Sequence, residues 1–292
     1  MRFRSHNFSL FFLGVLFFLN VISWIVVSDL KRPRGLEVNF FNVGQGDTIF
    51  IVSPTGQQIL IDGGPDSGIL EKLAKEMPFW DRTIDLIILT HPEADHLFGL
   101  IDVLKRYKVE NILWTGIVRD IPAYQEWISL ISKEGSQIKI AKLGQKIKLN
   151  PDNFIYFDIL YPFNELSGQE AKNSNDTSIV ARLVFNNISF LFTGDITAVV
   201  EEKLIQNNLQ FDADVLKISH HGSKYSTSDY FLENFLPEIA VIEVGENSYG
   251  HPTKEVLDRL EKFAIKVLRT DQNGDIKIIT NGKNYAISTF SN

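Results

Sequence analysis

The 292-residue chain contains no cysteine, and this absence removes several kinds of chemistry at once. Disulfides, thiolate catalysis and cysteine-bound zinc are excluded, so any metal ion must be held by histidine, aspartate, glutamate or water. The chain also lacks low-complexity tracts and an excess of positive charge, since its formal net charge is −7. Such a surface would repel nucleic acid at long range, although a local basic patch could still bind it.

An apolar run of 18 residues, residues 10–27, stands near the N-terminus. That length just spans the hydrocarbon core of a bilayer as a helix. A cleaved signal peptide is the alternative, but the run exceeds the ~7–15 apolar residues of a typical signal core. We therefore expect residues 1–35 to form one transmembrane anchor with a linker. The remaining residues, 36–292, are expected to form one domain outside the cytoplasm.

The hydrophobic period changes along this second part of the chain. Alternating residues and glycine-containing turns predict a β-meander over residues 36–61. Helical spacing then appears at residues 69–77, 97–107 and 124–131, between strand-like runs at 84–90 and 111–115. The second half runs from a hairpin at 178–193 into further helices and strands. Two mixed sheets packed face to face, with helices outside, would bury both halves, so we predict an α+β fold, a four-layer αββα sandwich.

The stretch His91-Pro92-Glu93-Ala94-Asp95-His96 places two imidazoles and two carboxylates directly after an apolar strand. A strand fixes the backbone, and a loop leaving it can turn several ligands onto one point. A metal site is one interpretation of this stretch. A polar loop that happens to carry two histidines is the other.

Potential ligands also stand at the ends of other predicted strands. Asp62 ends the strand at 59–62, Asp195 follows residues 190–194, and His220 ends the strand at 215–220. Together with His91, four separate strands finish in a potential metal ligand, which a chance scatter of polar residues would rarely produce. Five of the six histidines lie at or just beyond a predicted strand end: His91, His96, His220, His221 and His251.

These residues resemble the motifs of a known family. His91-x-Glu93-x-Asp95-His96 is similar to the His-x-His-x-Asp-His signature of the metallo-β-lactamase superfamily, and Thr193-Gly194-Asp195 resembles its later bridging aspartate. The match is closer still to the hydrolase domain of ComEC-type competence proteins, over nearly all of residues 36–280. Further motifs in the same order are Phe41-Asn42-Val43-Gly44-Gln45-Gly46-Asp47, Leu60-Ile61-Asp62-Gly63-Gly64, Asn175-Asp176-Thr177-Ser178, His220-His221-Gly222-Ser223 and Gly250-His251-Pro252. The resemblance implies a sandwich fold of metallo-β-lactamase type and a hydrolase with one or two divalent ions per chain, Zn²⁺ or Mn²⁺.

The chain departs from the family pattern in its ligand set and in its architecture. Glu93 stands at the second histidine of the superfamily signature, and no histidine lies between His96 and Asp195, where most relatives carry another ligand. Oxygen ligands would shift the preference of that site from Zn²⁺ toward Mn²⁺ or Mg²⁺, or weaken it. A ComEC protein also carries a large multi-span channel region, whereas this chain has a single apolar run. The resemblance therefore implies the hydrolase chemistry and not DNA transport.

The chemistry of each group indicates its role in the predicted site. Asp95 and His96 are expected to bind one metal ion and His91 the other, with Glu93 as a possible additional ligand. Asp195 can bridge both ions because a carboxylate has two oxygens. The ions would lower the pKa of a bound water to ~7 and make hydroxide available at neutral pH. Asp95 is thus both a metal ligand and part of the catalytic group.

His220, His221 and Asp62 complete that catalytic group. One of the two adjacent histidines, His221 or His220, is expected to bind metal, and the partner left over would protonate a leaving group. Asp62 is expected to orient a ligand instead of binding metal. A simple turn residue before Gly63-Gly64 is the alternative for Asp62.

Three further residues are candidates for binding substrate. Ser223 and Lys224 would hold a phosphate beside the metal ions, or serve local turns and solvent. His251 would line the site, or only shape the turn before Pro252. The one dense basic stretch is expected to be a solvated strand face: Lys139, Lys142, Lys146 and Lys148.

The leading hypothesis is a membrane-anchored, metal-dependent hydrolase of phosphodiesters, with single-stranded DNA or RNA as a possible substrate. A hydrolase of a small ester, lactone or β-lactam is the alternative enzyme, because the fold supports both and function depends on the site. A non-catalytic, membrane-tethered binding module that has lost a metal is the alternative of another class. The membrane and a phosphodiester substrate are the only partners that the sequence indicates.

Overall fold

The computed structural model describes residues 3–30, 35–149, 154–207 and 213–290. By its contacts the chain divides into two units, Met1–Arg34 and Gly35–Asn292. The first unit contains helix α1 (Phe3–Leu30), which includes the apolar run. Within the described residues, however, no helix has both the length and the apolar character needed to cross a membrane. Residues 31–34 of the predicted linker lie outside the described part of the chain.

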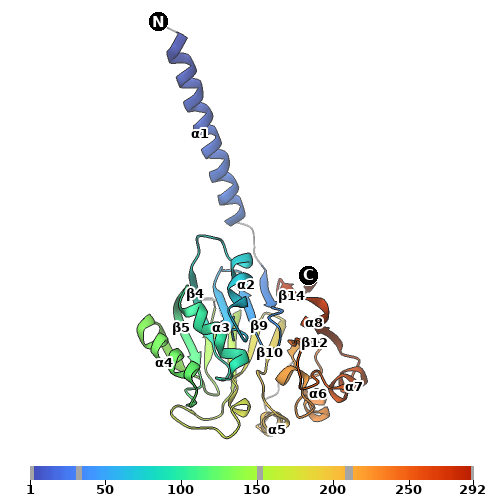
Figure 1. Ribbon diagram of the computed structural model, residues 1–292. Coiled ribbons are helices and arrows are strands. Elements are labelled where there is room, and N and C mark those ends of the chain that lie inside the picture. Colours follow the sequence, from blue (N-terminus) through green and yellow to red (C-terminus); the bar gives the residue numbers. More distant parts are fainter. Residues whose placement is uncertain (1–2, 31–34, 150–153, 208–212, 291–292) are drawn as a thin grey trace. The chain divides into compact units, whose positions relative to one another are not determined.

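Two mixed β-sheets build the second unit (Figure 1). The first has the order β15-β14-β1-β2-β3-β4-β5-β6 and consists of β1 (Leu36–Phe40), β2 (Ile49–Val52), β3 (Gln58–Ile61), β4 (Thr83–Ile88), β5 (Lys108–Trp114), β6 (Gln137–Ile140), β14 (Asp275–Thr280) and β15 (Tyr285–Phe290). The second has the order β13-β12-β11-β10-β9-β8-β7 and consists of β7 (Lys146–Lys148), β8 (Ile155–Tyr161), β9 (Val180–Phe185), β10 (Ile188–Phe192), β11 (Val215–Lys217), β12 (Ile239–Ile242) and β13 (Lys266–Arg269).

Helices cover the outer face of each sheet (Figure 1). The first sheet packs against α2 (Gly68–Glu76), α3 (Ala94–Leu104) and α4 (Pro122–Glu134), and the second against α5 (Ala198–Gln206), α6 (Asp229–Phe235) and α7 (Lys254–Lys262). The shorter elements are α8 (Thr270–Asn273) and the 3₁₀ segments η1 (Asn175–Thr177) and η2 (Ser219–Gly222). A third apolar cluster fills the space between the sheets, including Phe40, Phe157, Phe190 and Phe192. The predicted α+β sandwich of two sheets is confirmed.

In both sheets the pairing changes from antiparallel to parallel, at β3 in the first sheet and at β10 in the second. Strands β3, β4, β5 and β6 run parallel, and so do β10, β11, β12 and β13. The carboxyl ends of parallel strands meet at one edge of a sheet, where open α/β sheets form their binding crevices. Asp62 follows β3, His91 follows β4, and Asp195 follows β10. The topology therefore delivers the predicted ligands to one end of the domain.

Helix α3 begins earlier than its apolar spacing predicted. Its first residue is Ala94, whereas the hydrophobic pattern starts at Leu97. Asp95 and His96 consequently lie in the first helical turn and not in a loop. An acidic residue is favourable there because the helix N-terminus carries partial positive charge. The helix fixes the spacing of these two side chains more firmly than a loop would.

A close backbone contact sets the distance between β3 and α3. The loop after β3 donates from Gly63 N to the carbonyl oxygen of His96 (2.8 Å), and Gly99 N donates to Gly64 O (3.1 Å). A Cβ added at Gly99 would lie 1.8 Å from the carbonyl oxygen of Gly63. Only glycine permits this approach, which brings Asp62 next to His96.

We expect Gly99→Ala to lower the free energy of unfolding by about 3 kcal/mol, because the methyl group must push β3 and α3 apart. Gly135→Ala is the matched control. Gly135 has a φ of 78° and open space around its Cβ position, so that substitution should cost only about 1 kcal/mol of backbone strain. Urea denaturation followed by tryptophan fluorescence measures both, and equal losses would contradict the packing argument.

Candidate metal centre

A cavity of about 200 Å³ opens where the strand ends of the two sheets converge. Its lining consists of Gln45, His91, Glu93, Asp95, Asn175, Asp195, His220, His221, Tyr249 and His251. Six of the sequence-predicted metal or catalytic residues are in this set, and His96 and Asp62 lie directly behind it, fully buried. Residues far apart in the sequence thus form one cluster of imidazoles and carboxylates.

The Asp62 carboxylate organises two of these histidines. It accepts hydrogen bonds from the backbone N–H of Thr90 (2.8 Å), from Thr90 Oγ1 (2.6 Å) and from His96 Nδ1 (2.8 Å). Thr90 Oγ1 in turn lies 3.1 Å from Nδ1 of His91, and it accepts there because its own proton goes to Asp62. These hydrogen bonds therefore hold a proton on Nδ1 of both imidazoles and leave Nε2 as the nitrogen that a metal ion could bind.

Three buried ligand atoms of the cluster have no hydrogen-bond partner among the described residues. They are Nε2 of His91, Nε2 of His96 and Oδ1 of Asp195, all buried. Ligand atoms of these three residues lie within 4.8 Å of one another. Buried polar atoms are normally satisfied, so unsatisfied electron-pair donors on three clustered residues fit a metal ion.

A second group shares His96 with the first. Asp95 Oδ2 lies 3.2 Å from His221 Nε2, and ligand atoms of Asp95, His96 and His221 also lie within 4.8 Å of one another. Asp195, a member of the first group, also approaches the second, with Oδ2 3.5 Å from His96 Nε2 and 3.6 Å from His221 Nε2. Its position is therefore compatible with contact to both groups.

His220 and His221 occupy an unusual backbone conformation in η2, with φ values of 50° and 52°. Left-handed backbone is uncommon for residues other than glycine and often occurs at functional sites. The turn sends the two side chains in different directions. His221 is buried with Nδ1 2.8 Å from the carbonyl oxygen of Glu243, whereas His220 lines the cavity wall beside Asn175. The structure thus brings His221 into the ligand cluster and leaves His220 at the wall, with Nε2 4.0 Å from Asp195 Oδ2.

Glu93 lies apart from the ligand groups. Its Oε1 lies 2.7 Å from a guanidinium nitrogen of Arg119 and accepts a hydrogen bond from Ser174 Oγ. Among the described residues, Glu93 belongs to no group of potential ligands, although it lines the cavity. The expectation that Glu93 binds metal stays a prediction, and the ion pair with Arg119 competes with it.

The three predicted substrate-binding residues are not equally placed. His251 lines the cavity, with its ring 5.4 Å from that of His220. Ser223 is buried behind it, and its Oγ accepts from Tyr225 N (3.4 Å). Lys224 is exposed, with Nζ 5.2 Å from the ring of Tyr225. Of these three, only His251 belongs to the cavity lining.

Three buried charged residues beneath the cluster were missed by the sequence reasoning. Lys217 contacts the carboxylate of Asp47, donates to Gly194 O (3.1 Å) and has its Nζ 3.7 Å from Asp195 Oδ1. Asp47 also approaches His221 Nδ1 (3.3 Å), and Glu243 accepts from Thr48 N (2.8 Å). Lysine within the apolar run 215–218 and the aspartate after Gly46 were the available signals. Neither a lone lysine nor a turn aspartate indicates burial by itself.

The electrostatics of the cluster favour added positive charge. Burial opposes protonation of His96 and His221, yet the neighbouring carboxylates, Asp195 foremost, raise the pKa of His96 well above its usual value and that of His221 to about 10. Burial would raise the pKa of Asp195, but His221, His96 and Lys217 hold it well below its usual range. Histidines that attract protons this strongly lie in a negative potential, which a divalent cation would neutralise.

Burial dominates at three other histidines. It lowers the pKa of His91 to about 3 and that of His251 to about 4, and it also lowers the pKa of His220. These imidazoles are neutral at physiological pH. Neutral imidazole is the form that binds metal, and it is also the form that accepts a proton.

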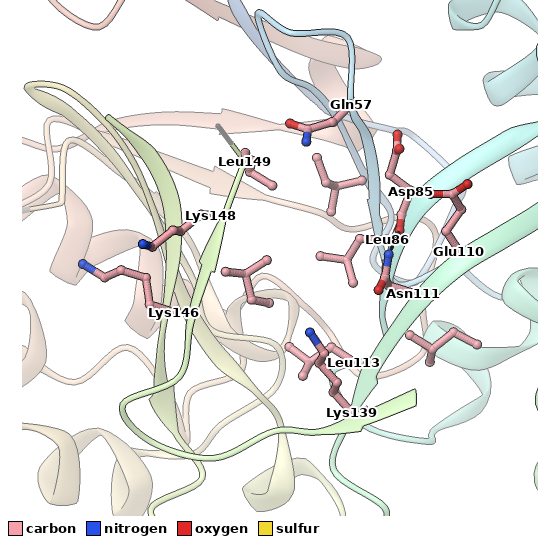
Figure 2. A pocket seen from close by; sticks show the side chains of 13 residues that line it. Gln57, Asp85, Leu86, Glu110, Asn111, Leu113, Lys139, Lys146, Lys148 and Leu149 are labelled. Atoms are coloured by element: carbon pink, nitrogen blue, oxygen red, sulfur yellow. Dashed lines mark hydrogen bonds between the residues drawn. The ribbon is translucent and has the colours of Figure 1, made fainter. Parts of the chain in front are cut away.

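A second cavity, of about 460 Å³, is lined by residues of β3, β4, β5 and β6 of the first sheet and of β7 of the second. Figure 2 shows it from close by. Leu86 and Leu113 contribute to its apolar part, and Asp85, Glu110 and Lys139 to its charged part. Lys146 and Lys148 of the predicted basic stretch lie on its β7 side. Its lining contains no histidine, so the candidate site is the first cavity.

Comparison with known proteins agrees with this geometry. The sequence profile described as "Metallo-beta-lactamase superfamily" matches residues 41–245, which is more than half of the chain. ComE operon protein 3 of Bacillus subtilis (strain 168) is 30% identical over 260 residues, covering 82% of this chain and 32% of that protein. Competence protein ComA of Neisseria gonorrhoeae is 30% identical over 261 residues, covering 84% and 33%. The chain thus spans about a third of the length of these relatives.

Solved structures share the fold at low sequence identity. CmlA, a diiron β-hydroxylase from Streptomyces venezuelae, has a TM-score of 0.55 at 12% identity, covering 85% of this chain and 55% of its own. A long form RNase Z from yeast has a TM-score of 0.50 at 13% identity, covering 84% and 42%. The predicted resemblance to ComEC-type competence proteins is confirmed at the level of sequence, and the fold implies divalent metal ions. The chain belongs to the metallo-β-lactamase superfamily of hydrolases.

Proposed function

We propose that this chain is a metal-dependent phosphodiesterase that cleaves single-stranded nucleic acid. The observation that carries the proposal is the set of unsatisfied ligand atoms around Asp195, held by Asp62 and Thr90 at the convergence of both sheets. The names of its relatives support the substrate class: two are competence proteins or products of a competence operon, and one fold neighbour is a ribonuclease.

The ligand set fits one complete metal site and one partial site. Ligand atoms of Asp95, His96 and His221 lie within 4.8 Å of one another, and Asp195 Oδ2, 3.5 Å from His96 Nε2 and 3.6 Å from His221 Nε2, would supply a fourth ligand to the same ion. His91 and Asp195 alone remain for a second, because Glu93 is paired with Arg119. A divalent ion bound here would act as a Lewis acid and make a water nucleophile available at neutral pH.

The protein's own residues orient and exchange protons around that site. Asp62 keeps His96 and His91 in the tautomer that binds metal, and the carbonyl of Glu243 does the same for His221. His220 is the group at the cavity wall that can transfer a proton, because its ring faces the cavity beside Asn175 and burial keeps it neutral. Its neutral form would accept a proton from the attacking water and return it to the leaving oxygen.

We further propose that the chain is attached to a membrane by the apolar run, with residues 36–292 outside the cytoplasm. The exposed apolar side chains of α1 support this, including Phe11, Phe17, Phe18 and Trp24. Alkaline carbonate extraction of cells expressing the full chain should leave it in the membrane pellet. Recovery in the carbonate supernatant would contradict attachment, and resistance to protease added to spheroplasts would contradict the orientation.

The full chain with Mn²⁺ or Zn²⁺ should cleave a labelled single-stranded oligonucleotide, and chelation should abolish the cleavage. Asp195→Asn should lower the rate by roughly 100-fold or more, because the shared carboxylate is lost. Asp66→Asn, at an exposed aspartate on the loop after β3, is the matched control and should retain activity. Hydrolysis of an ester or lactone with intact nucleic acid would refute the proposal.

One ion per chain should survive gel filtration, as measured by mass spectrometry of the eluted metal. Asp62→Asn should weaken binding of that ion by roughly 10- to 100-fold, because it disturbs the orientation of both His91 and His96. The same Asp66→Asn control should bind as the unchanged protein does. Two ions retained with equal affinity would show that Glu93 leaves Arg119 to complete the second site.

A further inference from the structure

The rim of the metal cavity carries an exposed aromatic ring. Tyr249 lines the cavity, yet its side chain is 74% exposed. Exposed aromatic residues scattered singly over a surface need no explanation. This ring differs because it belongs to a row of rings that leads out of the metal centre.

That row runs from the cluster to the surface in three steps. The ring of His221 lies 6.2 Å from that of His220, His220 lies 5.4 Å from His251 at 78°, and His251 lies 5.7 Å from Tyr249 at 28°. The last pair is stacked, so the ring of Tyr249 lies nearly parallel to that of His251. Its other face is available to a further planar group.

The backbone at Tyr249 is held by hydrogen bonds within its own loop. The side-chain oxygen of Asn247 accepts from the backbone N–H of Tyr249 (3.1 Å) and of His251 (3.0 Å). Its amide nitrogen donates to Gly245 O and His251 O, both at 2.9 Å. One amide side chain therefore makes four hydrogen bonds and holds the loop from both ends.

The two ends of the loop are packed against the cavity itself. A Cβ added at Gly245 would lie 2.3 Å from the backbone of Gly44, next to Gln45, which lines the cavity. After the loop, Thr253 N donates to Gly222 O (2.9 Å) in η2, the segment of His220 and His221. The backbone at Tyr249 is therefore held beside the segments that carry the ligands, and little ordering of this loop remains to oppose binding.

We propose that Tyr249 is a stacking platform for an unpaired nucleobase next to the scissile phosphate. The inference rests on the proposed function and deepens it, because the platform selects single strands. Bases within a duplex are already paired and stacked, whereas an unpaired base can lie on the ring without that cost. Stacking is tolerant of sequence because every base has a π face. Cleavage beside this platform is therefore expected to show no strong base preference.

The test compares two strands of equal charge, of about 12 nucleotides, within the ~4–16 that single-strand binding folds cover. One is a labelled oligothymidylate and the other carries an abasic spacer at every position. Binding to the full chain is measured by fluorescence anisotropy with Ca²⁺ in place of Mn²⁺. The unchanged protein should bind the base-bearing strand roughly 10-fold or more tightly than the abasic strand.

Tyr249→Ala should remove most of this preference by weakening only the base-bearing strand. Tyr249→Phe keeps the ring and should keep the preference, as should Tyr230→Ala, which removes an exposed tyrosine of α6 outside the cavity lining. An unchanged preference in Tyr249→Ala, equal weakening of both strands, or no preference in the unchanged protein would each overturn the platform.

Cleavage of the same strands with Mn²⁺ is recorded separately and distinguishes the two proposals. A Tyr249-dependent preference without cleavage would refute the phosphodiesterase and leave only the stacking of bases on Tyr249 standing. Cleavage without such a preference would leave the phosphodiesterase standing and overturn the platform.

Discussion

The hydrogen bonds received by the Asp62 carboxylate are the interaction on which the rest of the site depends. Asp62 lies where β3 ends, and its backbone has a φ of 56°. The close contact between Gly63 and Gly99 brings this carboxylate against α3, where it accepts from His96, and its bonds to Thr90 fix the chain that leads to His91. Strand pairing, glycine packing and side-chain hydrogen bonds thus act together to aim two imidazoles at one point. Burial raises the pKa of this carboxylate, so the three hydrogen bonds that it accepts offset only part of its desolvation.

The second constraint on the site is the negative charge of its buried carboxylates. Asp47, Asp62 and Asp195 are buried close together, and the structure balances them with Lys217 and with imidazoles that attract protons. Three ligand atoms still have no hydrogen-bond partner among the described residues. A divalent cation resolves both problems, since it neutralises charge and accepts the free electron pairs. Burying this cluster costs free energy of folding, and a functional role explains that cost better than a contribution to stability does.

Much of this site was predictable because its ligands follow strands with strong apolar patterns. The runs before Asp62, His91 and Asp195 indicate buried strands, and parallel strands deliver their carboxyl ends to one edge. The pairing of Glu93 with Arg119 was not predictable, because Arg119 lies on a separate loop whose path depends on tertiary packing. Lys217 was missed for a related reason. A lysine inside a short strand looks like an edge residue until the sheet order places β11 in the interior of the sheet, between β12 and β10.

The central claim is that Asp95, His96, Asp195 and His221 hold a metal ion. Anomalous diffraction from crystals of the Mn²⁺-loaded protein, recorded on both sides of the manganese absorption edge, tests it most directly. The account predicts a strong peak among these four side chains, within ~2.0–2.4 Å of their ligand atoms, the range of oxygen and nitrogen ligands to such ions. A cluster without a peak in Mn²⁺-loaded crystals, or a peak held by Glu93 and His91 instead, would contradict it.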